Sequence, residues 1–394
     1  GTSVHGISRT TTRLYIRLLP DPQRIRIGVE AYGDVASATR GQNGPVRTVN
    51  QGRTTYSAKK VLVMDIHGLH RHETEADSET ATDVVGFRTE YDGVPLLGSM
   101  ARARVQSEIR NRNGAANSIV NQRVTTSVRQ RLNAEVDKHL RRLETELSKK
   151  ALIPLQRLMV KATPVSFRTT NERAIARYRI AGDNQLAAYT PRPQAPSDSM
   201  LSVQVHQSAL NNLMNKLNLE GNQFELEDLY NIIPEKLGRN AAEIPEDLPE
   251  NVKVKFAARD AVRFYFDDGR IQVVVRLARL DSGRSHRWRN ITFQAFYRLE
   301  KTDHQLHFVR DGSIQLIAQR LSITDQMALR GIFSKVLSKN RKHVIVDEET
   351  SRDVKFTDLK LHQCVMRDGW LGLAWGAARP EKWRTAGGDS ATSR

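Results

Sequence analysis

A stripe of aliphatic residues runs through an otherwise polar stretch in the first half of the chain. Its members recur at steps of four, with one step of three. Residues three and four apart lie on one face of a helix, so the pattern predicts one long amphipathic helix over about Ala115 to Lys150, ended or kinked by Pro154. The stripe consists of Val120, Val124, Val128, Leu132, Val136, Leu140, Leu143 and Leu147.

Alternating apolar and polar residues on both sides of this helix predict strands. The stripe drifts around the helix because its mean step exceeds 3.6 residues, and a curved surface follows such a drift better than a flat one. We therefore expect a strongly bent sheet around the helix. The expected strands cover Leu14 to Leu18, Arg24 to Ala31, Thr54 to Ile66, Asp83 to Tyr91, Met100 to Ile109, whose composition also suits a helix, Met159 to Arg168 and Arg173 to Ile180.

The second half repeats this order of elements without a repeat of residues. Three prolines within Thr190 to Ser197 predict a linker. An Asp-Gly turn between alternating segments predicts a hairpin within a meander of long strands. A helix capped by Ser322 or Thr324 is expected after the meander. The expected strands are Leu201 to Val205, Val252 to Ala257, Val262 to Phe266, Ile271 to Leu280, Trp288 to Leu299, Leu306 to Gln319, Val344 to Val346, Val354 to Gln363 and Trp370 to Trp375.

The length of 394 residues exceeds what one core usually holds, so two domains are expected. We place them at residues 1–195 and 196–376, and expect residues 377–394 to be a flexible tail. The predicted fold class is α+β, with two tandem domains that are each a long, highly curved antiparallel sheet wrapped around an amphipathic helix. The expected setting is an exported chain, periplasmic or membrane-anchored, whose signal or anchor precedes Gly1.

The chain is strongly basic, with a formal net charge of +17 and an isoelectric point of about 10.1. Such an excess attracts anionic partners, including nucleic acid and anionic lipid headgroups. Solubility alone is an equally good explanation of the charge. The basic residues are scattered, which weakens the case for a nucleic-acid-binding tail.

Motifs for catalysis are missing from the sequence. It has no phosphate-binding glycine loop, no nucleophile elbow and no H-E-x-x-H pattern. Three histidines, His67, His70 and His72, precede three acidic residues and are weak candidates for metal ligands, although solvated loop residues explain them better. The single Cys364 excludes an internal disulfide and is expected in the core. We expect no enzyme activity and no cofactor.

Aromatic residues lie among arginines on the predicted strands of the second half. Such a mixture could stack nucleic-acid bases, but most of the rings fall on the apolar side of the alternation, which favours core packing. The residues are Phe264, Tyr265, Phe266, Phe293, Phe296 and Tyr297.

The segment from Leu201 to Trp375 resembles the tubular lipid-binding superfamily in its order of elements. It has a short strand and helix, a meander, a helix from about Asp325 to Lys339 and a closing strand. The first half, with its helix from Ala115 to Lys150, looks like a second copy. The resemblance implies curved sheets that wrap helices and leave an apolar groove between them. The single cysteine departs from the secreted animal members, which typically hold a disulfide.

This resemblance implies non-enzymatic binding or transfer of a lipid or another hydrophobic small molecule, with basic residues at an anionic membrane surface. The alternative is a structural or scaffold module that binds an acidic polymer such as nucleic acid. A hydrolase or metal enzyme is third. The expected ligand groove is lined by Val124, Val128, Leu132, Val136, Met327, Phe333 and Phe293.

Overall fold

The computed structural model divides the chain into two compact units, which are described separately. The first contains residues 1–147 and 164–178, and the second contains residues 148–163 and 179–394. The sequence-based boundary lay at residue 195 instead. The structure describes residues 2–92, 97–148, 153–237, 244–283, 286–301, 306–318, 321–339, 343–346 and 359–377.

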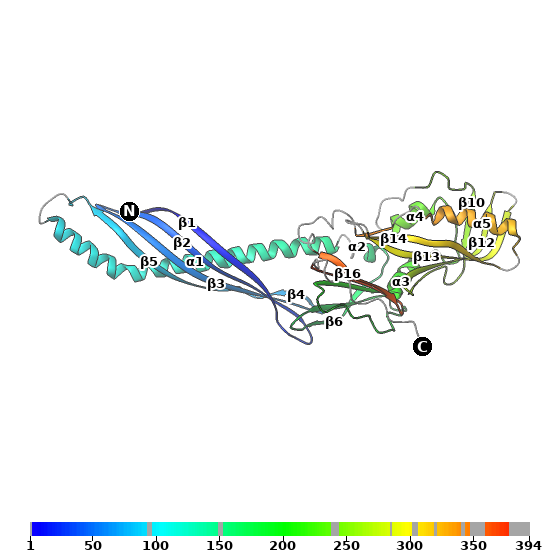
Figure 1. Ribbon diagram of the computed structural model, residues 1–394, viewed down its shortest axis with the longest axis horizontal. Coiled ribbons are helices and arrows are strands. Elements are labelled where there is room, and N and C mark those ends of the chain that lie inside the picture. Colours follow the sequence, from blue (N-terminus) through cyan, green and yellow to red (C-terminus); the bar gives the residue numbers. More distant parts are fainter. Residues whose placement is uncertain are drawn as a thin grey trace, which may run out of the picture. The chain divides into compact units, whose positions relative to one another are not determined.

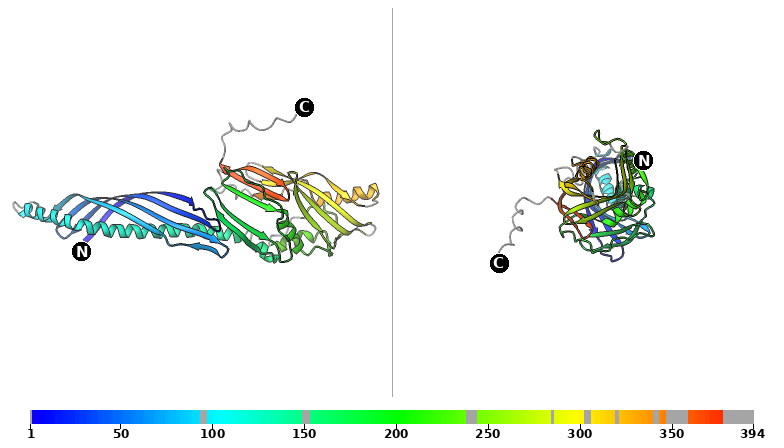
Figure 2. Two further views of the ribbon diagram at one scale, coloured as in Figure 1. Left: turned by 90° about the horizontal axis from the view of Figure 1, so that it is seen from below. Right: turned by 90° about the vertical axis from the view of Figure 1, so that its right-hand side faces the viewer.

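The first unit is built on a five-stranded antiparallel sheet (Figure 1). The strand order is β1-β2-β3-β4, and β5 pairs with β3 beside β4. Figure 2 shows the long strands curling around a helix. The strands are β1 (Thr2–Leu18), β2 (Ile25–Asn43), β3 (Val46–Asp65), β4 (Gly68–Arg71) and β5 (Glu75–Thr89).

Helix α1 (Leu97–Leu147) lies along this sheet and contacts mainly β5 and β3. Leu132 and Val136 are buried in a small apolar cluster with Ala31, Ala58 and Leu62 of the sheet. The expected stripe therefore provides the packing surface of the helix. Two sequence expectations were wrong here: the helix begins at Leu97, and residues 100–109 belong to it rather than to a strand.

The remaining strands of the first half are short. Strands β6 (Ala162–Thr169) and β7 (Ala174–Ile180) form a two-stranded sheet. Thr169 joins it to the main sheet of the first unit, because Thr169 and Asp21 exchange two backbone hydrogen bonds. Helix α2 (Ile153–Arg157) precedes β6.

The second unit contains a seven-stranded antiparallel sheet with the order β15-β14-β13-β12-β10-β9, in which β11 also pairs with β12. A separate three-stranded sheet has the order β16-β17-β8. The strands are β8 (Leu201–His206), β9 (Gln223–Glu225), β10 (Val252–Phe256), β11 (Val262–Asp267), β12 (Arg270–Ser282), β13 (His286–Lys301), β14 (Leu306–Ile317), β15 (His343–Val346), β16 (Leu359–Arg367) and β17 (Trp370–Ala377).

Three helices complete the second unit: α3 (Gln207–Lys216), α4 (Leu229–Lys236) and α5 (Ile323–Val336). Ser322 caps α5, because its hydroxyl accepts a hydrogen bond from the backbone N–H of Asp325 at 3.1 Å. This confirms the first of the two predicted caps. Leu329, Ile332 and Phe333 of α5 are buried in a large apolar cluster with β10, β12 and β13.

The predicted α+β class with curved antiparallel sheets is confirmed. The Asp-Gly hairpin is present, since Asp267 pairs with Arg270 across the turn between β11 and β12.

Cys364 is exposed, so its expected place in the core was wrong. The predicted tail begins at residue 377, the last residue of β17, and its residues 378–394 lie outside the described residues. Residues 354–358 of the predicted strand Val354 to Gln363 also lie outside them. None of the described helices is long and apolar enough to cross a bilayer.

Candidate functional site

The register of the first unit's sheet identifies the side chains that share its concave face with α1. Ala58 of β3 packs in the apolar cluster of Leu132, so even-numbered residues of β3 face the helix. Ala58 pairs with Ala31 of β2, and Ala31 pairs with Leu14 of β1. Partners in neighbouring strands point to the same face, so odd-numbered residues of β2 and even-numbered residues of β1 are concave.

Two large aliphatic side chains of β1 are exposed on this concave face. Leu14 is 64% exposed and Ile16 is 75% exposed, although their register partners Ala31 and Val29 belong to the buried cluster or pack against it. The helix contacts mainly β5 and β3, on the far side of the sheet from β1. The apolar cluster therefore continues into an uncovered aliphatic surface at the edge strand.

A lysine lies inside the same part of the unit. Lys60 is concave on β3, is only 5% exposed, and pairs with Val29, which in turn pairs with Ile16. Its Nζ donates to Oδ1 of Asn133 on α1 at 2.5 Å. Thr74 donates to the same oxygen at 2.6 Å, and no carboxylate of the described residues forms an ion pair with Lys60. Among the described residues, the hydrogen-bond partner of the ammonium is therefore a neutral amide oxygen.

The other end of the concave face is polar. Thr54 and Thr80 share a hydrogen bond of 2.7 Å, and Ser78 donates to the backbone oxygen of Asn121 on α1 at 3.0 Å. The side-chain oxygens of Asn117 and Asn121 are buried and accept no hydrogen bond from the described residues. The lining between sheet and helix therefore changes from aliphatic to hydroxyl and amide along the strands.

Tyr56 marks the boundary between the two linings. Its ring lies over Gly33 of β2, where an added Cβ would come within 2.4 Å of the ring carbon Cζ. The Tyr56 hydroxyl is 2.5 Å from Oγ1 of Thr12 on β1. A glycine at position 33 is therefore required for the ring to lie across the sheet.

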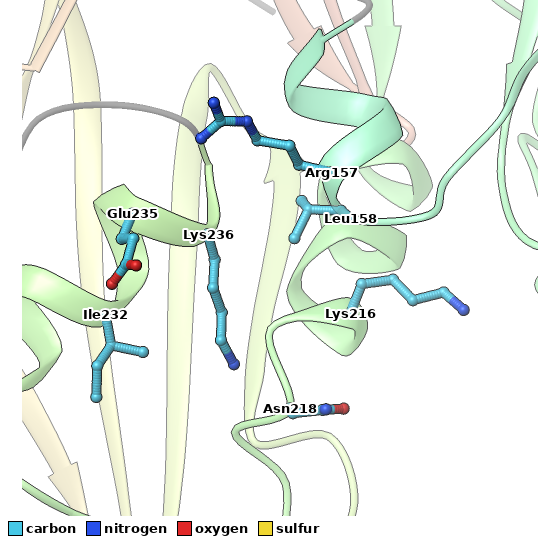
Figure 3. Close-up of a pocket in the computed structure, with 7 residues that line it drawn as sticks. All are labelled: Arg157, Leu158, Lys216, Asn218, Ile232, Glu235 and Lys236. Atoms are coloured by element: carbon cyan, nitrogen blue, oxygen red, sulfur yellow. The ribbon is translucent and has the colours of Figure 1, made fainter.

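A cavity of about 450 Å³ lies in the second unit and has a basic lining (Figure 3). Arg157, Lys216 and Lys236 stand in the last turns of α2, α3 and α4, where cations offset the negative end of a helix. Lys236 donates to the backbone oxygen of Leu217 at 2.6 Å. Figure 3 shows the three cationic groups pointing in different directions, so they do not converge on one anion, and the acidic Glu235 also lines the cavity.

A second cavity, of about 360 Å³, is lined mostly by amides whose hydrogen bonds hold the fold together. Asn211 of α3 accepts from the backbone N–H of Phe264 and donates to its carbonyl oxygen. Asn212 donates to the carbonyl oxygens of Ile180 and Leu186. These side chains fasten α3 to β11 and to the segment before β8.

The predicted groove residues fall in both units. Val124 and Val128 are half-buried on α1, where Leu132 and Val136 are buried. In the second unit, Phe293 and Phe333 are buried with ring centroids 3.4 Å apart, whereas Met327 is 69% exposed. Whether these seven side chains line a ligand site stays a prediction.

Of the three histidines, His70 lies in the short strand β4, and His67 and His72 flank it. All three are exposed. Nε2 of His70 is 3.3 Å from Oδ1 of Asp65, which also accepts the backbone N–H of His67. The latter hydrogen bond is the main reason that the pKa of Asp65 is lowered. Across the described residues, no three side chains of His, Cys, Asp or Glu are placed to hold a metal ion.

Sequence reasoning missed Leu14, Ile16 and Lys60. A signal for Lys60 was present, because it stands in the same alternation as Leu62 and Met64 on one predicted strand. No such signal marked Leu14 and Ile16, whose exposure depends on where the helix lies on the sheet.

We compared the chain with protein families, curated proteins and solved structures. No family model matches the sequence, and no curated protein matches it. Among solved structures, a crystal structure of lipopolysaccharide binding protein aligns with 96% of this chain and 88% of its own, at 9% identity and a TM-score of 0.36. A score of this size does not establish a shared fold.

Proposed function

We propose that the chain binds an amphiphile on the concave face of its first unit, without catalysis. The observation that carries this proposal is the exposure of Leu14 and Ile16 next to the apolar cluster of α1. Covering one such side chain is worth roughly 2 kcal/mol. An acyl chain that lies along both side chains would remove them from water, and this burial would favour binding.

The finer proposal is that the amphiphile carries an anionic headgroup. Ile16, Val29 and Lys60 occupy one row of the sheet, so the backbone of Lys60 lies two strand spacings, about 10 Å, from that of Ile16. The buried ammonium has only neutral acceptors among the described residues. A carboxylate or phosphate that reaches it would supply the missing opposite charge.

The experiment is a titration of the purified chain with a fluorescent fatty acid, followed by the same titration with a neutral fluorescent alcohol of equal chain length. We expect saturable uptake of both, with tighter binding of the acid. Mass spectrometry of an organic extract would identify any amphiphile carried through purification. Absence of both saturable uptake and extracted lipid would refute the proposal.

The second candidate function is binding of an acidic polymer, and the salt dependence of the affinity distinguishes it from binding of an amphiphile. Affinity for DNA or RNA falls steeply with salt because binding releases counterions. Uptake of an acyl chain depends mainly on apolar contact, so it should persist at high salt. Tight salt-sensitive binding of nucleic acid without fatty-acid uptake would favour the scaffold function instead.

A further inference from the structure

The sheet of the first unit has two open edges, and β1 forms one of them. Among the described strands, β1 pairs with β2 alone. It is 17 residues long, and its side chains from residue 3 to residue 17 are exposed. A long exposed edge strand presents unpaired backbone groups to which another strand can add.

Strand β5 forms the opposite edge over most of the sheet's length. In the described part of the molecule its only strand partner is β3. Helix α1 packs along β5, and Asn113 of the helix donates to one backbone acceptor of the strand, the carbonyl oxygen of Thr82. The convex side chains of β5 are exposed along the strand.

The convex side chains at the two edges carry opposite charges. On β1 these include Arg9 and Arg13, and on β5 they include Asp77, Glu79 and Asp83. None of the five forms an ion pair with the described residues. Arg17, the next convex arginine of β1, is already paired with Glu30 at 2.7 Å. The basic and acidic edges are thus complementary, and neither pairs with a further strand among the described residues.

Strand direction and register also agree with pairing between these edges. Because β1, β2, β3 and β5 are successively antiparallel, β5 runs opposite to β1. Arg13 pairs with Tyr32, Tyr32 with Ser57, and Ser57 with Asp77, so Arg13 and Asp77 share one row of the sheet. Setting β1 of a second copy beside β5 would continue the antiparallel sheet with Arg13 opposite Asp77.

Pairing of β1 with β1 of another copy is disfavoured by the same charges. Convex arginines would then face arginines, and like charges across neighbouring strands are destabilising. We propose that copies of this chain associate head to tail, with β1 of one copy pairing with β5 of the next. Such a contact joins two different surfaces, so repeating it makes a ring or a filament.

Two charge-reversal variants test this pairing. The first carries R9E and R13E, which makes both edges acidic, and the second carries D77R and E79R, which makes both edges basic. We expect sedimentation velocity to show concentration-dependent association of the unmodified chain in the micromolar range. Each variant alone should associate at least about tenfold more weakly, because every edge contact would set like charges together.

Mixing the two variants is the decisive measurement. Acidic β5 edges of the first variant fit basic β1 edges of the second, and the converse contact fits as well, so an equimolar mixture should assemble. A variant with all four changes should associate like the unmodified chain. The matched control, R129E with R131E on the exposed face of α1, should leave association unchanged. A monomeric unmodified chain, or a mixture that stays dissociated, would overturn the proposal.

Discussion

The ammonium of Lys60 on β3 and the amide oxygen of Asn133 on α1 form a hydrogen bond of 2.5 Å inside the first unit. The oxygen is shared with the hydroxyl of Thr74. A buried charge that is met by a neutral oxygen alone lowers stability relative to an apolar side chain of similar size. The hydrogen bond therefore connects α1 to β3, but it does so through a buried ammonium that lowers stability.

The first prediction concerns Lys60→Met. Removing the buried charge should raise the free energy of unfolding by about 1 to 2 kcal/mol, since Asn133 keeps Thr74 as a donor. Affinity for a fluorescent fatty acid should fall, and affinity for the neutral alcohol should not. Urea unfolding and fluorescence titration measure the two effects.

The matched control for that variant is Lys59→Met. Lys59 is the next residue of β3, on the convex face, and is exposed. It should leave the preference for the acid unchanged and lower stability only slightly, through the lost attraction to Glu30 on the neighbouring strand. A Lys60→Met variant that is less stable and binds the acid as before would contradict the role given to this ammonium.

The second prediction concerns the exposed aliphatic pair. Replacing Leu14 and Ile16 together with Ser should weaken binding of the fluorescent fatty acid at least about tenfold, because two apolar contacts are lost. Stability should change little, since both side chains are exposed. Ile7→Ser is the control, because Ile7 is convex on the same strand and 80% exposed. Equal loss of binding in the control would count against a concave site.

The third prediction concerns the contact between Gly33 and Tyr56. Gly33→Ala should destabilise the chain by about 1 to 3 kcal/mol, because the new methyl group would overlap the Tyr56 ring and the backbone oxygen of Thr11. Gly86→Ala on β5 is its control, since a Cβ there meets no atom within 4 Å. Thermal unfolding of both variants checks the prediction. Equal stability of the two would show that both Tyr56 and the backbone at Thr11 move aside without cost.

The fourth prediction separates core packing from ligand contact in the second unit. Phe333→Ala should cost about 3 to 5 kcal/mol of stability, because its ring packs on Phe293 in the buried cluster. Met327→Ala should cost far less, since that side chain is mostly exposed. Urea unfolding provides the comparison. A mild Phe333→Ala phenotype with loss of fatty-acid binding would instead support the predicted groove.

Much of the fold could be predicted from local pattern. The stripe centred on Leu132 is the packing surface of α1, and the Ser322 cap and the Asp267 hairpin lie where the sequence places them. The segment from Met100 to Ile109 was misassigned as a strand, because alternation over ten residues fits both a strand and a helix of high polarity. The apolar stripe begins only after it, so hydrophobic period could not identify this first part of α1.

The candidate site was harder to predict because it depends on what the fold leaves uncovered. Leu14 and Leu62 look alike in sequence, as apolar members of alternating strands, yet one is exposed and the other buried. The difference comes from the position of α1 over β5 and β3, which is a property of tertiary packing. Lys60 differs in this respect, because an inward-facing lysine can be recognised from alternation alone.

The last prediction concerns Glu30 on the convex face. Nε of Arg17 donates to its carboxylate at 2.7 Å, and the hydroxyl of Tyr32 donates to the same oxygen at 3.0 Å. The hydrogen bond from Arg17 is the main reason that the pKa of Glu30 is lowered below its ordinary value. The fold thus favours the ionised carboxylate, and this contribution to stability is present above the ordinary pKa of a glutamate.

As the pH falls below that ordinary value, the unfolded chain takes up the proton first, and the contribution disappears once the pH passes the lowered pKa of the folded state. Urea unfolding at a series of pH values from neutral downward should therefore show that the destabilisation caused by Arg17→Met becomes smaller as the pH falls. Glu30→Gln should remove most of that pH dependence. A penalty for Arg17→Met that does not change with pH would mean that the arginine acts through contacts other than its bond to the carboxylate.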